Sequence, residues 1–172
     1  MYRDDRFLGT TVYWARGNAW ALCALAAALQ HGGSDPHRST YLRIFRQLAT
    51  RISALQSADG AWRSSLLHPV DYPMPEASAT ASFTYSLAWG VSSGILPAEV
   101  HAPVVARAWE WLSREALQRP SGLVGYCQPG ASEPERNRNT FNRSTTANFC
   151  VGQFLMAASH VVRLADASPL LI

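Results

Sequence analysis

Apolar residues along the chain indicate two kinds of helical segment. The segments at 18–31, 77–93 and 148–164 carry apolar or small side chains on nearly every face, which is typical of a buried helix. The segments at 36–56 and 97–117 repeat apolar residues every three or four positions and place most of their charged residues on the other side. The sequence therefore predicts buried and half-exposed helices in alternation.

Two long polar loops, at 57–76 and 120–147, interrupt this alternation. Each follows a half-exposed helix and precedes a buried one, so both loops should lie at the same end of the array. Repeated helix pairs that cannot bury their faces alone stack side by side. The pattern thus predicts a double ring of α-hairpins with a binding cleft at its looped end. A four-helix bundle is not expected, because every helix would then carry one apolar stripe.

Composition narrows the class of protein. The length of 172 residues and the apolar fraction of 48% suit one packed domain over residues 1–172. The net charge of +3 is mild and spread out, so we expect no nucleic-acid partner. The longest apolar run, 19–29, is too short to span a bilayer, so we expect no membrane partner. Met1 is followed by no secretory signal, which favours a cytoplasmic location.

The metal-ligating residue types show no recognised spacing. Cys23, Cys127 and Cys150 form no paired framework, and two of them lie in apolar helical patterns as expected of core thiols. The five histidines lack the spacing of a metal-binding helix, and there is no glycine-rich phosphate loop. We therefore expect neither a metal site nor a cofactor.

The most informative stretch is Trp14-Ala-Arg-Gly-Asn-Ala-Trp20. Gly17 and Asn18 can supply a turn or cap at the start of the first helix. Arg16 beside a helix N-terminus suits an anion, and the two indole rings suit the C–H face of a sugar. The stretch predicts an acidic-sugar site. The alternative is that both tryptophans are core anchors and the arginine pairs with a carboxylate.

The two loops add further candidates. Trp62 and Tyr126 are either sugar platforms or residues that pack beneath their loops. Asp71 and Glu76 are the best local carboxylates on the side of the expected cleft. Capping of the helix that begins near residue 77 is favoured over catalysis for these carboxylates, since a negative charge stabilises a helix start.

Several stretches together resemble the unsaturated glucuronyl and rhamnogalacturonyl hydrolases, glycoside hydrolase families 88 and 105. They are the 14–20 stretch, Asp59-Gly-Ala-Trp-Arg63, 72–78 with 83–90, and 124–130 with 149–155. The resemblance covers essentially the whole chain and is strongest to family 105. It implies an all-α, incomplete (α/α)6 toroid of about two and a half helical hairpins, the C-terminal portion of a family module.

The resemblance also implies an unusual reaction. Family members release a C4=C5 unsaturated galacturonic or glucuronic acid from the non-reducing end of oligosaccharides left by lyases, such as those from pectic rhamnogalacturonan. One aspartate protonates the vinyl ether and helps water add at C5, unlike the carboxylate pair of most glycosidases. Arg16 and Trp20 match the family's substrate-binding positions, and we add Trp14 and Asn18 beside them.

The catalytic aspartate of the family lies upstream of the 14–20 stretch, and residues 1–13 contain no counterpart. The resemblance thus leaves the catalytic residue unknown and predicts that this chain alone is inactive. Two alternatives remain open: a non-catalytic sugar-binding fragment, and a helical interaction fragment that associates through exposed inner-helix faces.

Overall fold

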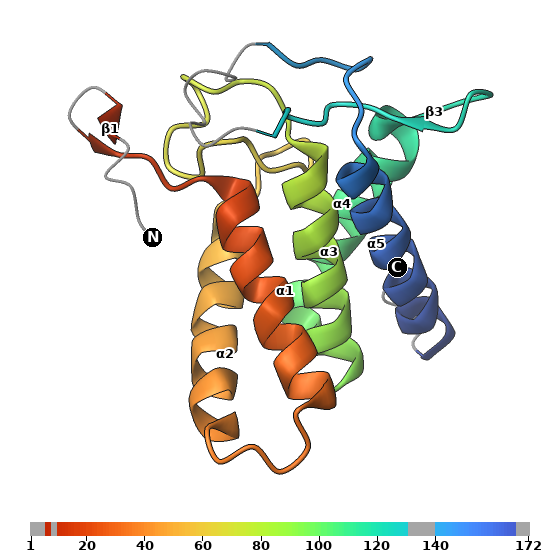
Figure 1. The fold of residues 1–172 in the computed structure, drawn as a ribbon. Coiled ribbons are helices and arrows are strands. Elements are labelled where there is room, and N and C mark those ends of the chain that lie inside the picture. Colours follow the sequence, from red (N-terminus) through yellow and green to blue (C-terminus); the bar gives the residue numbers. More distant parts are fainter. Residues whose placement is uncertain (1–5, 8–9, 131–139, 168–172) are drawn as a thin grey trace.

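The computed structural model describes residues 6–7, 10–130 and 140–167, and helices dominate them (Figure 1). The helices are α1 Ala15–His31, α2 Arg38–Ala54, α3 Ala77–Ser92, α4 Ala98–Trp111 and α5 Asn148–Ala167. Two small antiparallel pairs accompany them: β1 Arg6–Phe7 with β2 Thr10–Thr11, and β3 Leu117–Gln118 with β4 Leu123–Val124. The predicted helix order is confirmed, with boundaries displaced by a few residues.

The helices form two layers. α3 lies between α1 and α5 and contacts both, while α2 packs on α1 and α4 packs on α3 (Figure 1). The long loops and the β3–β4 hairpin gather at the end where α1, α3 and α5 begin. This is the predicted array of hairpins with its loops at one end.

The three inner helices differ in burial. Every residue of α3 from Ala77 to Val91 is buried, whereas Trp20 of α1 is 51% exposed and Leu155 of α5 is 62% exposed. The prediction of burial on all faces is therefore correct for α3 and wrong for α1 and α5. The reason is position, because α3 has an inner helix on each side and α4 behind it, while α1 and α5 stand at the two edges.

Small side chains let neighbouring helices approach α3 closely, and three of its hydroxyl groups donate to backbone carbonyls one turn earlier. Thr80 Oγ1 donates to the Glu76 carbonyl (2.8 Å), Thr84 Oγ1 to the Thr80 carbonyl (2.7 Å), and Ser86 Oγ to the Ser82 carbonyl (2.9 Å). Each hydroxyl can be buried because its proton has an acceptor one turn earlier.

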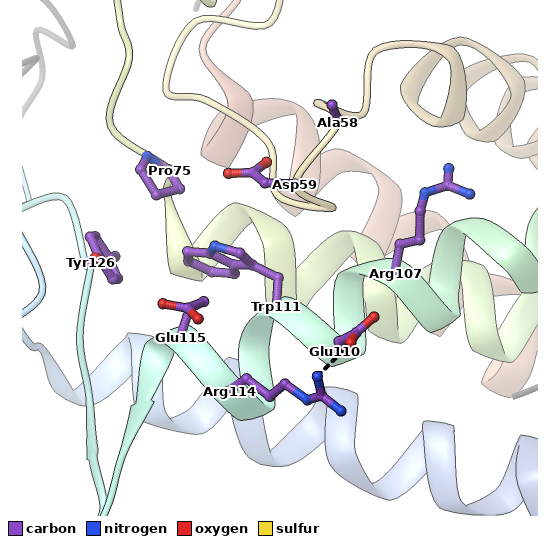
Figure 2. Close-up of a pocket in the computed structure, with 9 residues that line it drawn as sticks. All are labelled: Ala58, Asp59, Pro75, Arg107, Glu110, Trp111, Arg114, Glu115 and Tyr126. Atoms are coloured by element: carbon purple, nitrogen blue, oxygen red, sulfur yellow. Dashed lines mark ion pairs between the residues drawn. The ribbon is translucent and has the colours of Figure 1, made fainter.

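The outer helix α4 does not end as an α-helix. Its last residue, Trp111, runs into a single π-helical turn, η1 Leu112–Ala116, which leads into β3. Figure 2 shows this corner of the molecule, where the side chains of Trp111 and Glu115 lie close to Tyr126 of the second long loop.

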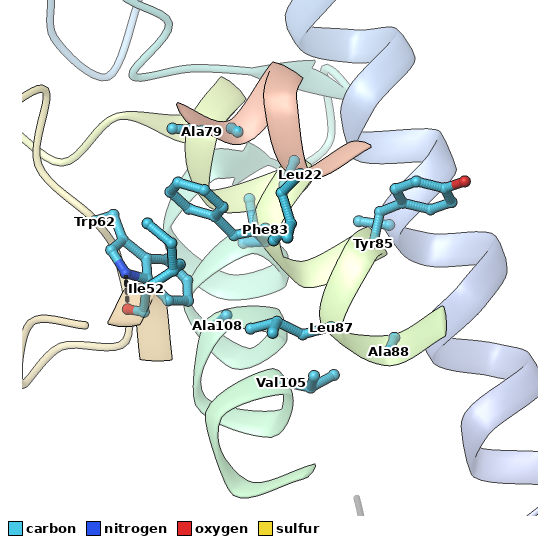
Figure 3. Close-up of a cluster of buried hydrophobic side chains, with 14 of the residues drawn as sticks. Leu22, Ile52, Trp62, Ala79, Phe83, Tyr85, Leu87, Ala88, Val105 and Ala108 are labelled. Carbon is cyan, nitrogen blue, oxygen red and sulfur yellow. Dashed lines mark hydrogen bonds between the residues drawn. The ribbon is translucent and has the colours of Figure 1, made fainter. Parts of the chain in front are cut away.

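The main core lies between the two layers (Figure 3). Trp62 is fully buried there, its ring centroid 5.1 Å from that of Phe83, and its indole Nε1 donates to the Ile52 carbonyl at 2.9 Å. The turn before it depends on Gly60, which has φ of 90° and contacts the Arg107 carbonyl so closely that no Cβ would fit. This turn anchors the loop after α2 to α4.

Candidate functional site

Arg16 lies in the first turn of α1 and is only 1% exposed. Its guanidinium donates from Nη1 to the Gln128 carbonyl at 2.6 Å and from Nη2 to the Pro129 carbonyl at 3.0 Å. The group is also held between two rings, 4.7 Å from the centroid of Trp14 and 4.8 Å from that of Phe149. It therefore ties the loop at 125–130 to the starts of α1 and α5.

Glu76 supplies the opposing charge. Its carboxylate is fully buried and caps α3 by accepting from the backbone N–H groups of Ser78 (3.3 Å) and Ala79 (2.7 Å). It also accepts from the Gln128 N–H at 3.2 Å and lies 3.8 Å from Arg16 Nη1. The expected capping role of Glu76 is confirmed, and its charge is compensated by a buried guanidinium.

The structure thus adopts the alternative that the sequence left open for Arg16. The guanidinium pairs with a carboxylate and with carbonyl groups inside the protein, so in this arrangement it has almost no surface to offer a substrate. The expected turn at Gly17 and Asn18 is wrong, because both residues lie within α1. Asn18 instead donates from Nδ2 to the Trp14 carbonyl at 2.8 Å.

The two tryptophans of the 14–20 stretch do come together. Their ring centroids are 5.7 Å apart at an interplanar angle of 70°, and Trp20 keeps half of its surface exposed. Trp14 is fixed by its indole Nε1, which donates to the side-chain amide oxygen Oε1 of Gln128 at 2.9 Å. Gln153 of α5 reaches Trp20: with its amide oriented to suit all its neighbours, its oxygen accepts from the indole at 3.2 Å. An exposed indole braced from behind is a suitable platform for a sugar ring.

The remaining candidates do not converge on this platform. Trp62 belongs to the core, so of its two alternatives the structure adopts packing beneath the loop. Tyr126 is half-buried and packs on Trp111, with ring centroids 5.6 Å apart. Asn18 lines a separate hollow of about 310 Å³ together with residues of α2. Asp71 is exposed on the first loop. No described carboxylate stands beside Trp20 as an evident general acid.

Three residues important to this region escaped the reasoning from composition and spacing. Gln128, Phe149 and Gln153 hold Arg16 or the two indoles, but each is ordinary in its local sequence. The signal that could have found them is that all three fall in stretches resembling the family, 124–130 and 149–155. Their roles depend on the fold, which brings those stretches to the start of α1.

Two thiols lie against the buried carboxylate. The sulfur atoms of Cys127 and Cys150 and a carboxylate oxygen of Glu76 lie within 4.8 Å of one another. The Cys150 thiol donates a hydrogen bond to Cys127, and this bond, together with burial and the nearby charge of Glu76, raises the pKa of Cys150 far above its ordinary range. The cluster is a poor cation site, because the carboxylate already accepts several hydrogen bonds and Arg16 lies beside it.

Residues 4–165 match glycosyl hydrolase family 88. The chain belongs to this family. A curated relative, an unsaturated 3S-rhamnoglycuronyl hydrolase of Formosa agariphila, is 38% identical over 90% of the chain, and the match covers 40% of the relative. The chain therefore spans well under half of that protein.

Solved structures agree. A family 88 glycosyl hydrolase from Bacteroides vulgatus is 37% identical, with a TM-score of 0.84 over 92% of this chain and 45% of its own. A protein described as a polysaccharide lyase is 39% identical, with a TM-score of 0.85 over 97% of this chain and 47% of its own. A possible family 105 member from Salmonella enterica shares the fold at 20% identity, with a TM-score of 0.77 over 89% of this chain and 40% of its own. The chain thus has the fold of part of a six-hairpin α/α toroid.

Within the described residues, no helix combines the length and apolar character needed to cross a bilayer.

Proposed function

We propose that this chain is the portion of an unsaturated uronyl hydrolase that carries one wall of the sugar site. The reaction is release of a C4=C5 unsaturated galacturonic or glucuronic acid from the non-reducing end of a lyase-generated oligosaccharide, by hydration of the vinyl ether. The observation that carries the proposal is the 38% identity over 90% of the chain to a relative named as an unsaturated rhamnoglycuronyl hydrolase.

The geometry supports a binding role for the exposed indole of Trp20. The ring stands at the looped end of α1, with Trp14 at its edge and Gln153 behind it. Arg16 acts on the sugar site indirectly. It fixes the loop at 125–130 through the Gln128 carbonyl, and the Gln128 side chain in turn holds Trp14 in place. Arg16 is thus a positioning residue for the platform rather than a direct partner of the uronate.

Catalysis requires groups beyond those described. Among the residues that the structure describes, none supplies a carboxylate in contact with Trp20, and apolar side chains of α1 and α5 lie exposed, including Trp20, Leu155 at 62% exposure and Val162 at 57%. We propose that helices equivalent to the rest of the relatives' toroid cover these edges and bring the general acid. The chain alone should then bind sugar weakly and turn over none.

The test follows the vinyl-ether absorbance of an unsaturated rhamnogalacturonan disaccharide. The chain is assayed alone and together with a separately produced N-terminal half of the Bacteroides vulgatus relative. The proposal expects a fall in absorbance only in the mixture, and a slower fall with Trp20→Ala. A rise in absorbance with a saturated polysaccharide would instead indicate a lyase, as in the second solved relative. Full turnover by the chain alone would overturn the requirement for added groups.

A further inference from the structure

A second hollow lies on the outer side of the molecule, away from the 14–20 stretch. It has a volume of about 530 Å³ and lies between the end of α4, the turn at residues 58–59 and the second long loop (Figure 2). Ligand pockets of proteins typically have volumes of about 300–1,000 Å³. The hollow is thus large enough for one or two sugar rings.

The floor and one wall of the hollow are flat and apolar. Trp111 lies in the middle and is 6% exposed, so it presents only an edge to the hollow, while the half-buried Tyr126 and Pro75 lie beside it (Figure 2). The rings of Trp111 and Tyr126 are tilted by 50° with centroids 5.6 Å apart, so together they form an angled surface rather than one sealed stack. Such a surface suits the C–H faces of a saccharide.

The rim is charged on both sides of this apolar surface. Asp59 and Glu115 present carboxylates, while Glu110 is engaged by Arg114 at 2.9 Å. Asp59 is held by Arg63 at 2.9 Å, whereas Glu115 has no ion pair or hydrogen bond to any described residue. Carboxylates and guanidinium groups are good acceptors and donors for hydroxyl groups. Arg107 also lines the hollow and Arg63 holds Asp59, so the charges of the rim nearly balance and favour a neutral ligand over a charged one.

Two irregular backbone segments build the hollow. Tyr126 has a φ of 57°, uncommon for a residue with a side chain, and is fixed there by hydrogen bonds of 2.9 Å from its N–H to Asn142 and from Ala77 to its carbonyl. The π-helical turn Leu112–Ala116 follows Trp111 and carries Glu115. Costly left-handed residues and π-helical turns are both concentrated at functional sites. Here they place one ring and one carboxylate at the same hollow.

We propose that this hollow is a second saccharide site, which binds a neutral sugar residue through Tyr126 and Glu115, with the exposed edge of Trp111 beneath it. It would hold a part of a longer carbohydrate that does not react, away from the Trp20 platform. The site does not depend on the proposed hydrolysis, because its lining comes wholly from described residues of this chain.

The test uses the whole ¹⁵N-labelled chain and follows the indole N–H signals of Trp111 and Trp20 by NMR. Methyl α-L-rhamnoside and cellobiose are the neutral probes, and D-glucuronate is the acidic one. We expect the Trp111 signal to shift with the neutral probes and to shift less with glucuronate. Glu115→Gln should weaken binding about tenfold, the effect of losing one charge-assisted hydrogen bond.

Tyr126→Gly removes the ring while suiting the positive φ, so it tests the wall without straining the backbone. It should also weaken binding about tenfold, which corresponds to about 1.4 kcal/mol. Glu99→Gln, which alters an exposed carboxylate elsewhere on α4, should leave the affinity unchanged, and Trp20→Ala should leave unchanged only the affinity read from the Trp111 signal. The proposal is overturned if the Trp111 signal does not move well above millimolar sugar, or if Trp20→Ala abolishes binding while Tyr126→Gly does not.

Discussion

Helices α3 and α5 both contain few charged residues, but neighbouring elements cover α3 and leave one side of α5 exposed. Both are poor in charge along most of their length, yet α3 is buried from Ala77 to Val91 while α5 exposes Val151, Leu155, Met156 and Val162. An apolar surface on a helix is suited to packing against other helices. The described residues provide such packing on every side of α3 but only on part of α5. The contrast separates the part of the fold that is complete from the part that remains open to a partner.

The largest loss of stability should come from a substitution at the start of α3. Glu76→Ala removes the cap of α3 and leaves Arg16 buried without its counter-charge. We expect a loss of about 3–5 kcal/mol in the free energy of unfolding, because an unpaired buried charge is costly. Urea denaturation followed by circular dichroism measures it.

The double variant Arg16→Met/Glu76→Ala is the control for that loss. Removing both charges should recover part of the stability, since no uncompensated charge remains. If Glu76→Ala cost less than about 1 kcal/mol, the pair would not be the buried anchor described above.

A matched pair of leucines compares the two helices directly. Leu87 of α3 is fully buried, whereas Leu155 of α5 is 62% exposed. Leu87→Ala should lower the free energy of unfolding by about 2–5 kcal/mol by leaving a cavity, and Leu155→Ala should change it by no more than about 0.5 kcal/mol. Equal losses in urea denaturation would mean that the exposed edge of α5 is already covered in solution.

Acid should weaken the contacts that both α4 and α5 make with their neighbours. Burial lowers the pKa of His101 below 6.5, and burial together with the charge of Arg163 lowers that of His160. The unfolded chain then binds more protons than the folded one below about pH 6.5, so stability is full above that pH and falls as the pH drops. The slope should reach at most about 1.4 kcal/mol per pH unit for each histidine.

In the unmodified chain, Ser53 Oγ and the His101 imidazole Nδ1 form a hydrogen bond of 3.0 Å. The glutamine of His101→Gln can keep a hydrogen bond to Ser53 but has no titratable group. Urea denaturation between pH 5 and about pH 7 should give a shallower slope for this variant than for the unmodified chain. An unchanged slope would show that the imidazole is charged when folded or does not sense the burial.

Charged residues on the exposed side of α5 should change self-association of the chain more than its free energy of unfolding. Leu155→Lys/Met156→Lys places two cations on the exposed side of α5, and we expect the free energy of unfolding to change by less than about 0.5 kcal/mol. Sedimentation velocity should show the unmodified chain associating and the variant closer to the 18.9 kDa monomer. Val100→Lys, at an exposed apolar residue of α4, is the matched control and should not change association.

Sequence reasoning succeeded where the deciding interaction is local. The period of apolar residues in α2 places Phe45 and Ile52 in the core, and both are buried. Glu76 was expected as a cap because the helix start it serves is the next residue along the chain. The order of helices and the end at which the loops gather follow from the same local patterns.

It failed where the deciding partner is distant in sequence. Arg16 is held by Glu76 and by the Gln128 carbonyl, which are 60 and 112 residues away, and no local pattern announces either contact. Trp62 was equally open to a role as a surface platform, and its burial depends on Phe83 of the next inner helix, whose ring lies 5.1 Å from its own. The apolar sequence of α5 favoured burial, and exposed inner-helix faces followed only from the open ring that the resemblance implied, because an apolar sequence does not say which chain supplies the neighbour.

The buried thiols of Cys127 and Cys150 allow local opening of the structure around them to be measured. Both are buried where α3, α5 and the 125–130 loop meet, and the raised pKa of Cys150 keeps that sulfur protonated. An alkylating reagent attacks thiolates, so it should modify Cys150 only when the junction separates. The rate at which Cys150 is labelled would then report how often α5 separates from α3 and the 125–130 loop, without an added probe group.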